Sequence, residues 1–169
     1  MSAVQQITTD QFDAGMIGER PRQSVGPVAT GSCRLRAVQC DDRALAVESV
    51  EQRRRCGPAD LRQSPDDKYL YVSNHKQNVV RKIDLAANRS VGIASTGTET
   101  RSMAIAEDGE SLYVVNYRDG TMSKVRASDM TILQTLDTGV HPLGITYDPV
   151  SRQVWVANYA GTLRVFVDR

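Results

Sequence analysis

The chain has 169 residues, with 21 basic and 20 acidic side chains and a formal net charge of +1. This length suits one ordinary domain with its own core. The balanced charge gives no general attraction to nucleic acid or to an anionic membrane, so we predict neither as a partner. No apolar run approaches the roughly 18 residues that span a bilayer. Residues 1–22 lack a signal-peptide pattern, so we expect a cytoplasmic protein.

Residues 1–56 differ in composition from the rest of the chain. They contain no lysine, the run Arg53-Arg54-Arg55, and all three cysteines, which are Cys33, Cys40 and Cys56. The cysteines form no CxxC pair and have no histidine at metal-ligand spacing, which favours reduced thiols. The arginine run lacks interleaved aromatics and is more typical of a solvated loop than of a phosphate site. We predict no metal and no cofactor.

From residue 57 onward, one strand pattern recurs at a fixed spacing. It covers 69–74, 111–116 and 153–158, and it ends each time in an asparagine: Asn74, Asn116 and Asn158, spaced by 42 residues. A fixed period near 40 residues is typical of repeat architectures.

The middle repeat predicts four strands, over 101–106, 111–116, 121–127 and 132–138. Turns that contain Gly109 and Gly120 separate the first three strands, since glycine accepts positive φ. Four antiparallel strands in about 42 residues are typical of one propeller blade. We therefore predict an all-β fold: a β-propeller of about three to four four-stranded antiparallel blades, with residues 57–169 as the clear blades. Residues 1–56 are either a degenerate first blade, over 14–50, or a poorly ordered leader.

Large aromatic residues share one register in the three second strands: Tyr71, Tyr113 and Trp155. These strands are apolar on both faces, as expected for a sheet packed between two others. We predict that all three aromatics are buried between blades, and that truncation of Tyr113 or Trp155 to alanine costs about 3–5 kcal/mol.

The strings Leu-Tyr-Val-Ser-Asn, Leu-Tyr-Val-Val-Asn and Val-Trp-Val-Ala-Asn resemble the YVTN-type β-propeller repeat, as do Ser64-Pro65-Asp66-Asp67 and the segment 138–145. The resemblance covers residues 57–169. It implies a propeller of seven or eight blades, often exported, with relatives among lactonase-like propellers and quinoprotein-type dehydrogenase subunits. This chain has fewer repeats than that pattern.

The connections before the first strands and after the second strands should emerge at one end of the sheets. Propeller ligands commonly sit where such loops converge. We call this end the loop face and predict that it binds a ligand through His75, Glu99, Arg101, Tyr117, Arg118, His141 and Tyr159. His141 stands in a connection, before Pro142, so His141→Ala should leave the fold intact.

The chain has no GxSxG elbow, no HExxH motif and no glycine-rich phosphate loop, so no catalytic residue is predicted. The favoured function is a non-catalytic binding or scaffold protein that presents the loop face to a small molecule or a protein. The alternatives are a lactonase-like hydrolase or a quinoprotein-like dehydrogenase subunit, both by family analogy, and a remnant of a longer propeller gene.

The last predicted strand, over 162–168, lacks an outer neighbour in its blade. The segment 3–9 would be a strand of the missing fourth kind and could pair beside it. An uncovered edge invites pairing with another chain. We therefore expect either a homodimer, completed by exchange of N-terminal strands, or an open chain that aggregates.

Overall fold

The computed structural model describes residues 2–8 and 57–168, and its regular structure is β-strand. No helix in this part of the chain is long and apolar enough to cross a membrane. The strands are β1 (Ser2–Thr8), β2 (Pro58–Gln63), β3 (Tyr69–Asn74), β4 (Val79–Asp84), β5 (Arg89–Ser95), β6 (Thr100–Ile105), β7 (Ser111–Asn116), β8 (Thr121–Arg126), β9 (Ile132–Asp137), β10 (Pro142–Asp148), β11 (Gln153–Asn158) and β12 (Thr162–Val167).

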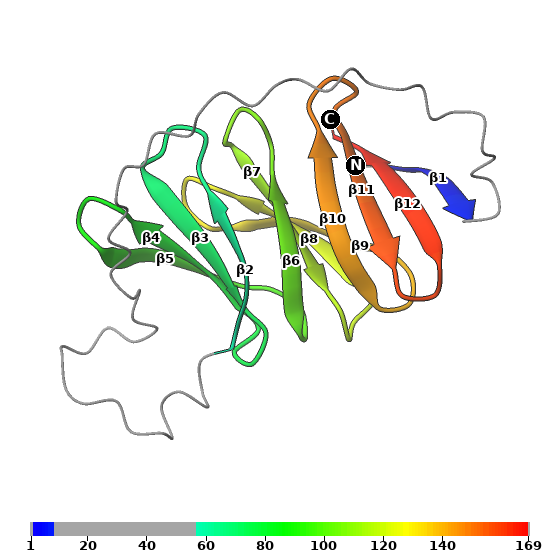
Figure 1. Cartoon of the computed structure of the whole chain (residues 1–169), viewed down its shortest axis with the longest axis horizontal. Coiled ribbons are helices and arrows are strands. Elements are labelled where there is room, and N and C mark those ends of the chain that lie inside the picture. Colours follow the sequence, from blue (N-terminus) through cyan, green and yellow to red (C-terminus); the bar gives the residue numbers. More distant parts are fainter. Residues whose placement is uncertain (1, 9–56, 169) are drawn as a thin grey trace, which may run out of the picture.

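These strands form three four-stranded antiparallel sheets that follow the repeat. The first is β2-β3-β4-β5, the second is β6-β7-β8-β9, and the third is β1-β12-β11-β10. Figure 1 shows the sheets side by side as a fan, with the first strands β2, β6 and β10 toward the viewer. The innermost strands contact each other, β6 with both β2 and β10. The predicted all-β propeller class is confirmed, with three blades in the described part of the chain.

The third blade is completed by the N-terminus. β1 runs antiparallel to β12, with Ser2 opposite Val167 and Thr8 opposite Thr162. The predicted fourth-type strand is therefore present, and it pairs within its own chain. Residues 9–56 lie outside the described residues. They include the predicted degenerate blade, the arginine run and the three cysteines. The predicted division of the chain at residue 56 stays a prediction.

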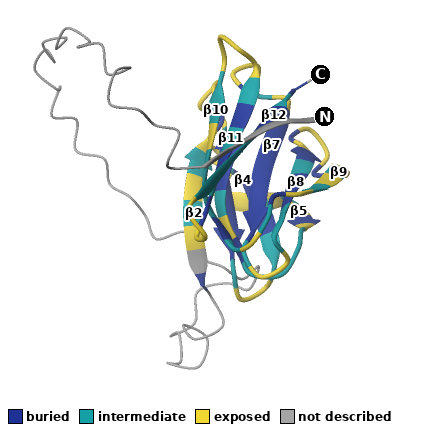
Figure 2. Cartoon of the chain, turned by 90° about the vertical axis from the view of Figure 1, so that its right-hand side faces the viewer, coloured by how far each residue is buried: buried dark blue, intermediate teal, exposed yellow. Residues whose placement is uncertain are grey.

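Two apolar cores fill the two junctions between sheets. Tyr71 packs with Leu112 and Val114 in the first core, and Tyr113 packs with Val154 and Phe166 in the second. Strand β7 lies between both cores and is buried along its whole length, as Figure 2 shows in dark blue. The predicted burial of Tyr71 and Tyr113 is confirmed, with 2% and 0% of their surfaces exposed.

The prediction that Trp155 is buried between blades is wrong, because this side chain is only half-buried. It has the same register in β11 as Tyr113 has in β7, so it points away from the second core. No fourth sheet stands on that side among the described strands. The buried face of β11 is the other one, formed by Val154, Val156 and Asn158.

Polar side chains tie neighbouring blades together at the rim of these cores. Arg62 donates to the Met103 carbonyl over 2.8 Å, and Ser102 donates to the Leu143 carbonyl over 2.6 Å. Lys124 forms a 2.6 Å ion pair with Asp168, whose side chain is 7% exposed. Such bonds satisfy buried polar groups and fix the angle between blades.

Candidate functional site

The loop face begins where each second strand ends in its asparagine. The Asn116 carboxamide donates to Thr121 and Ser123, and the Asn116 backbone carbonyl accepts the Gly120 amide at 3.1 Å. The Asn158 carboxamide donates to the Thr138 carbonyl at 2.6 Å, which joins the third blade to the connection before it. The repeated asparagine therefore holds the tight turn that follows each second strand.

The residue before each first strand and the residue after each second strand are joined by one backbone hydrogen bond. The amides of His75, Tyr117 and Tyr159 donate to the carbonyls of Gly57, Glu99 and His141, over 2.9–3.0 Å. Glu99 and His141 take left-handed φ values of 56° and 53°. Within each blade, this repeated geometry holds the start of the first strand beside the end of the second strand.

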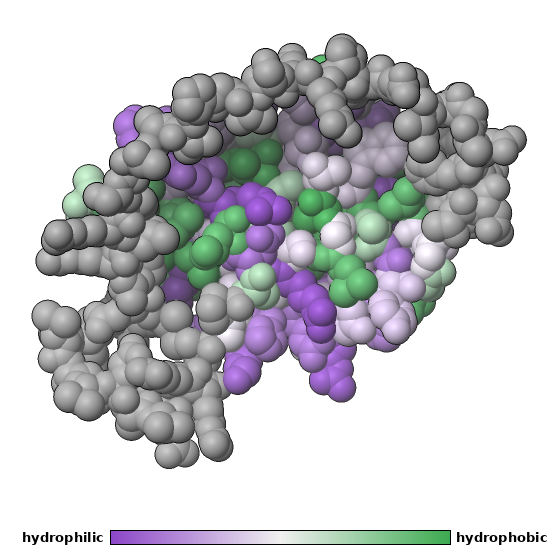
Figure 3. All heavy atoms as spheres, in the orientation of Figure 1, coloured by the Kyte–Doolittle hydropathy of each residue, from purple (hydrophilic) through white to green (hydrophobic). Residues whose placement is uncertain are grey.

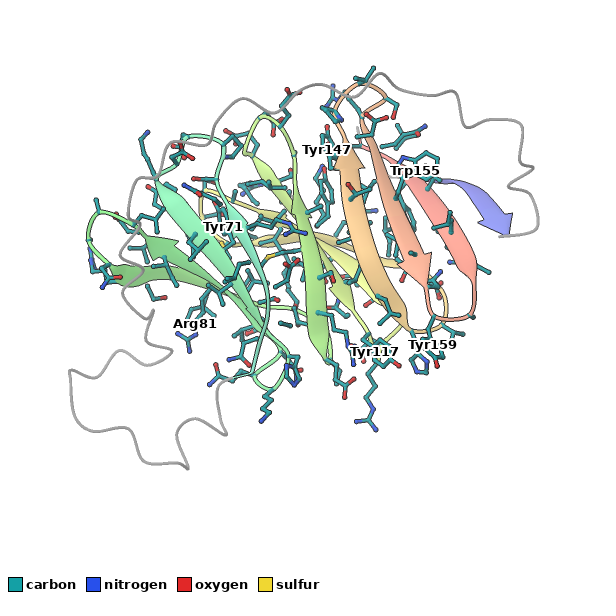
Figure 4. All side chains as sticks on the ribbon, in the orientation of Figure 1. Tyr71, Arg81, Tyr117, Tyr147, Trp155 and Tyr159 are labelled. Carbon is teal, nitrogen blue, oxygen red and sulfur yellow. The ribbon has the colours of Figure 1, made fainter. Side chains whose placement is uncertain are left out.

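Arg101, Tyr117 and His141 form a stack at this face. The His141 and Tyr117 rings are 4.5 Å apart and nearly parallel, at 14°. The Arg101 guanidinium lies over the Tyr117 ring, 4.0 Å from its centre. Cation–π and aromatic contacts of this kind fix side-chain orientation. Figure 4 shows Tyr117 and Tyr159 at the same lower end of the fan, where Figure 3 shows hydrophilic residues.

A hollow of about 360 Å³ opens beside this stack, between the second and third blades. It is within the size range of small-molecule sites. It is lined by Arg118, Asp119, Gly120, Asp137, Gly139, Val140, His141 and Arg164. His141 thus contributes to both the stack and the hollow. Arg164 is held by Asp137, with 2.6 Å between its Nη1 and the carboxylate.

Two glycines make room for the hollow. Gly120 and Gly139 both have positive φ, at 66° and 93°. A Cβ atom on Gly120 would lie 2.6 Å from the Gly139 carbonyl oxygen, which is closer than real Cβ contacts allow. A side chain at Gly120 would therefore push the two turns apart.

The structure brings together four of the seven predicted site residues. Arg101, Tyr117 and His141 are stacked, and Arg118 lines the hollow with His141. Glu99 contributes its backbone, through the bond to Tyr117. Tyr159 is at the same face and 73% exposed. His75 belongs to the first blade, where its Nδ1 is 2.8 Å from the Gly57 carbonyl oxygen, and it does not line the hollow.

Sequence reasoning missed Arg164 and Asp137, because it considered only the connections. Arg164 lies within β12, and Asp137 ends β9. A signal was available, since Arg164 is a charged residue opposite Val156 on the inner face of its sheet. Among the described residues, no group of three histidine, cysteine or acidic side chains could hold a metal ion.

A second hollow, of about 400 Å³, lies at the opposite end of the sheets, between the first two blades. Tyr69, Tyr71 and Lys82 line it, with Asp108 and Glu110. Lys82 is buried there, under the Tyr69 ring, and donates to the Ala127 carbonyl over 2.8 Å. Burial and the nearby carboxylates raise the pKa of Tyr71 to about 12.

Comparison with known proteins identifies sequence relatives over much of the chain. The profile of the family described as "Lactonase, 7-bladed beta-propeller" matches residues 30–131, more than half of the chain. A 6-phosphogluconolactonase of Buchnera aphidicola is 30% identical over 104 residues, which are 59% of this chain. Those residues span 29% of that relative.

Solved structures share the fold. Hydrazine synthase of Kuenenia stuttgartiensis superposes with a TM-score of 0.59 at 24% identity, over 69% of this chain and 32% of that chain. The WD40 repeats of RRP9 superpose with a TM-score of 0.61 at 17% identity, over 66% of this chain and 36% of that chain. At these identities the likeness concerns the fold alone.

Proposed function

Because this chain belongs to the lactonase family of seven-bladed β-propellers, we propose that its loop face takes part in the hydrolysis of a sugar lactone. One observation supports the proposal most directly: His141 and Arg118 line the same hollow of about 360 Å³. A lactone is a cyclic ester, so its opening requires a base for water and a positive group for the oxyanion. The hollow contains His141 as a base, and Arg118 and Arg164 as positive groups.

In this proposal His141 is the general base. It takes a proton from water as the water oxygen bonds to the lactone carbonyl carbon. The Arg118 guanidinium stabilises the oxyanion that forms. The bond between the carbonyl carbon and the ring oxygen then breaks, and the proton passes to that ring oxygen. The products are an open-chain hydroxyl and a carboxylic acid, which ionises in solution.

The surroundings of His141 suit this role. Its ring is held against Tyr117, and Arg101 covers the other side of the Tyr117 ring. Its carbonyl is held by the Tyr159 amide. A base that is fixed by stacking loses little freedom when substrate binds.

The likeness to a 6-phosphogluconolactonase leads us to propose a phosphorylated sugar lactone as the substrate. Arg118 is exposed at the edge of the hollow, and Arg164 stands on its wall. Guanidinium groups suit a phosphate because they donate parallel hydrogen bonds. The chain spans 29% of that relative, and we propose that it supplies one part of the binding face.

The experiment measures lactone opening by the full chain with a δ-lactone of a sugar acid and its 6-phosphate, each corrected for spontaneous hydrolysis. His141→Asn is the main variant, because asparagine tolerates left-handed φ. We expect it to lower kcat by about 100-fold or more. Arg118→Lys retains the charge and should retain more activity than Arg118→Ala. Val150→Ala, at a distant exposed turn, is the control. Equal rates for His141→Asn and the unmodified chain would refute the proposal.

The second candidate is a non-catalytic binding protein. It is favoured by the mutual contacts of Arg101, Tyr117 and His141, which hold aromatic and hydrogen-bonding side chains in fixed positions beside the hollow. Calorimetry with the open sugar acid separates the two functions. Binding that is lost in Tyr117→Ala, without lactone turnover by the unmodified chain, would favour this candidate.

A further inference from the structure

The junction between the first two blades and the junction between the last two contain the same tyrosine–lysine pair. Tyr71 lies opposite Lys82 in the first junction, and Tyr113 lies opposite Lys124 in the second. Lys124 forms an ion pair with Asp168. Lys82 is also buried, at 7% exposure, yet no described carboxylate lies within ion-pair distance of it. The first junction therefore has a buried ammonium group without an anionic partner, which is an unfavourable arrangement.

The second hollow lies beside this ammonium group. In the second junction, the Tyr147 ring and the Asp168 carboxylate contact the tyrosine and the lysine. Forty-two residues earlier, these positions hold Ile105, which has no ring, and Arg126, which pairs with a surface aspartate instead. Neither residue supplies the missing carboxylate, and the hollow of about 400 Å³ opens beside Lys82.

The Tyr71 hydroxyl is a second group in this hollow without a partner. Tyr71 is 2% exposed and lines the hollow, and its hydroxyl makes no hydrogen bond with the described part of the chain. The Tyr113 hydroxyl, by contrast, is fully enclosed by protein. Figure 4 shows Tyr71 on β3, from which it packs against the second sheet. Because burial and nearby carboxylates raise the pKa of Tyr71 to about 12, the hydroxyl keeps its proton at neutral pH and can donate to a ligand.

The Lys82 ammonium group is held in position with one hydrogen to spare. It donates to the carbonyls of Ala127, over 2.8 Å, and Ser128, over 3.4 Å. The Tyr69 ring centre lies 3.9 Å from its nitrogen. An ammonium group has three hydrogens, so one of them remains for an anionic ligand. A donor that is fixed before binding loses little freedom when the ligand enters.

The rim of the same hollow has the opposite charge. Asp66, Asp108 and Glu110 line the hollow and are exposed, whereas Tyr71 and Lys82 are buried. Asp66 already pairs with a neighbouring lysine. Neither Asp108 nor Glu110 has an ion-pair partner among the described side chains. The hollow therefore has a buried positive end and an exposed negative rim.

We propose that this hollow binds a small zwitterion, an amino acid whose carboxylate enters first. The carboxylate pairs with the Lys82 ammonium and accepts a hydrogen bond from the Tyr71 hydroxyl. It takes the role that an aspartate of the protein has in the second junction. The ammonium group of the ligand meets Asp108 and Glu110 at the rim. A simple anion would face these carboxylates and a simple cation would face Lys82, so a ligand that carries both charges is favoured over either.

The first experiment titrates the full chain by calorimetry with glycine, β-alanine and longer unbranched amino acids. The matched fatty acid and alkylamine of each length carry only one of the two charges. We expect at least one amino acid to bind about 10-fold or more tightly than its two matched probes. No binding by any amino acid of the series would overturn the proposal. A matched fatty acid or alkylamine that binds as tightly as the amino acid would also overturn it.

Variants of the full chain then locate the bound amino acid. Tyr71→Phe retains the ring and should weaken binding by about 10-fold or more, and Lys82→Met should weaken it by about 100-fold. Glu110→Gln changes an exposed turn, so it tests the rim without disturbing the core. Tyr113→Phe is the matched control, because it makes the same change in the second junction and should leave the affinity unchanged.

Circular dichroism and urea unfolding check that each variant is folded. Weaker binding in Tyr71→Phe and Glu110→Gln, with unchanged binding in Tyr113→Phe, supports the proposal. Unmodified affinity in both Tyr71→Phe and Glu110→Gln would overturn it, even if Lys82→Met failed to fold.

Discussion

At the residue scale, the ion pair of Lys124 and Asp168 stabilises the junction between the second and third blades. Burial opposes ionisation of Asp168, but the hydrogen bond from Lys124 outweighs it and lowers the pKa of this carboxyl. The side chains are 14% and 7% exposed. Loss of one member of such a pair leaves the other charge buried without compensation.

We therefore expect Asp168→Asn to lower the free energy of unfolding by about 3–5 kcal/mol at pH 7. Because folding lowers this pKa, the stabilisation is present above the unfolded value of about 3.9 and is lost as pH falls through the folded value. Urea unfolding of both proteins across acid pH measures the difference. Lys124→Met added to Asp168→Asn should recover stability, since no buried charge remains. A difference that does not change with pH would contradict this role.

At the element scale, β1 decides whether the third blade has an open edge. Its pairing with β12 covers the row of backbone groups that would otherwise be free to pair with other chains. The contact joins the two ends of the sequence. It is therefore the least local strand pairing in the described structure, and it depends on seven residues, Ser2–Thr8.

Gln6→Pro tests this pairing, because proline removes a backbone donor from the middle of β1, opposite Arg164. We expect the β12 amides that face β1 to exchange hydrogen faster by an order of magnitude or more. Gln6→Thr, which favours a strand, is the control and should retain protection. Hydrogen exchange read by mass spectrometry reports on 162–167 directly. Unchanged protection in Gln6→Pro would show that β12 does not depend on β1.

At the scale of the whole molecule, the main contacts between the described blades join sequence neighbours, the first blade with the second and the second with the third, as in other repeat proteins. The middle blade has two junctions, and each end blade has one. Residues at equivalent positions should therefore contribute unequally. Leu112 is fully buried in the first core, whereas Leu70, 42 residues earlier, is half-buried on the outer face of the first sheet.

Leu112→Ala should lower the free energy of unfolding by about 2–5 kcal/mol, and Leu70→Ala by less than half of that. The two substitutions remove the same atoms, so the difference measures the effect of the junction alone. Urea unfolding of both variants at the same protein concentration gives both values. Equal losses of stability would mean that Leu70, on the outer face of the first sheet, is packed as closely as Leu112 is in the first core.

The amino-acid sequence predicted the repeat and the four strands of the middle blade, with bounds close to those of the structure. Period-two alternation and turn residues act locally, so β7 was predicted at Ser111–Asn116 and found there, and Gly109 and Gly120 have positive φ. It also placed His141 and Tyr117 at one face, because strand direction alternates along the chain.

Which of these residues contact each other depends on how the blades pack in the folded chain. A 42-residue period makes Tyr71, Tyr113 and Trp155 look equivalent, but burial depends on whether a further sheet follows, and Trp155 has none among the described strands. The hollow beside His141 likewise depends on the distance between two blades. Arg164 reaches it from a strand because the ion pair with Asp137 spans the junction, and a pattern read along one blade carries no information about the spacing between two.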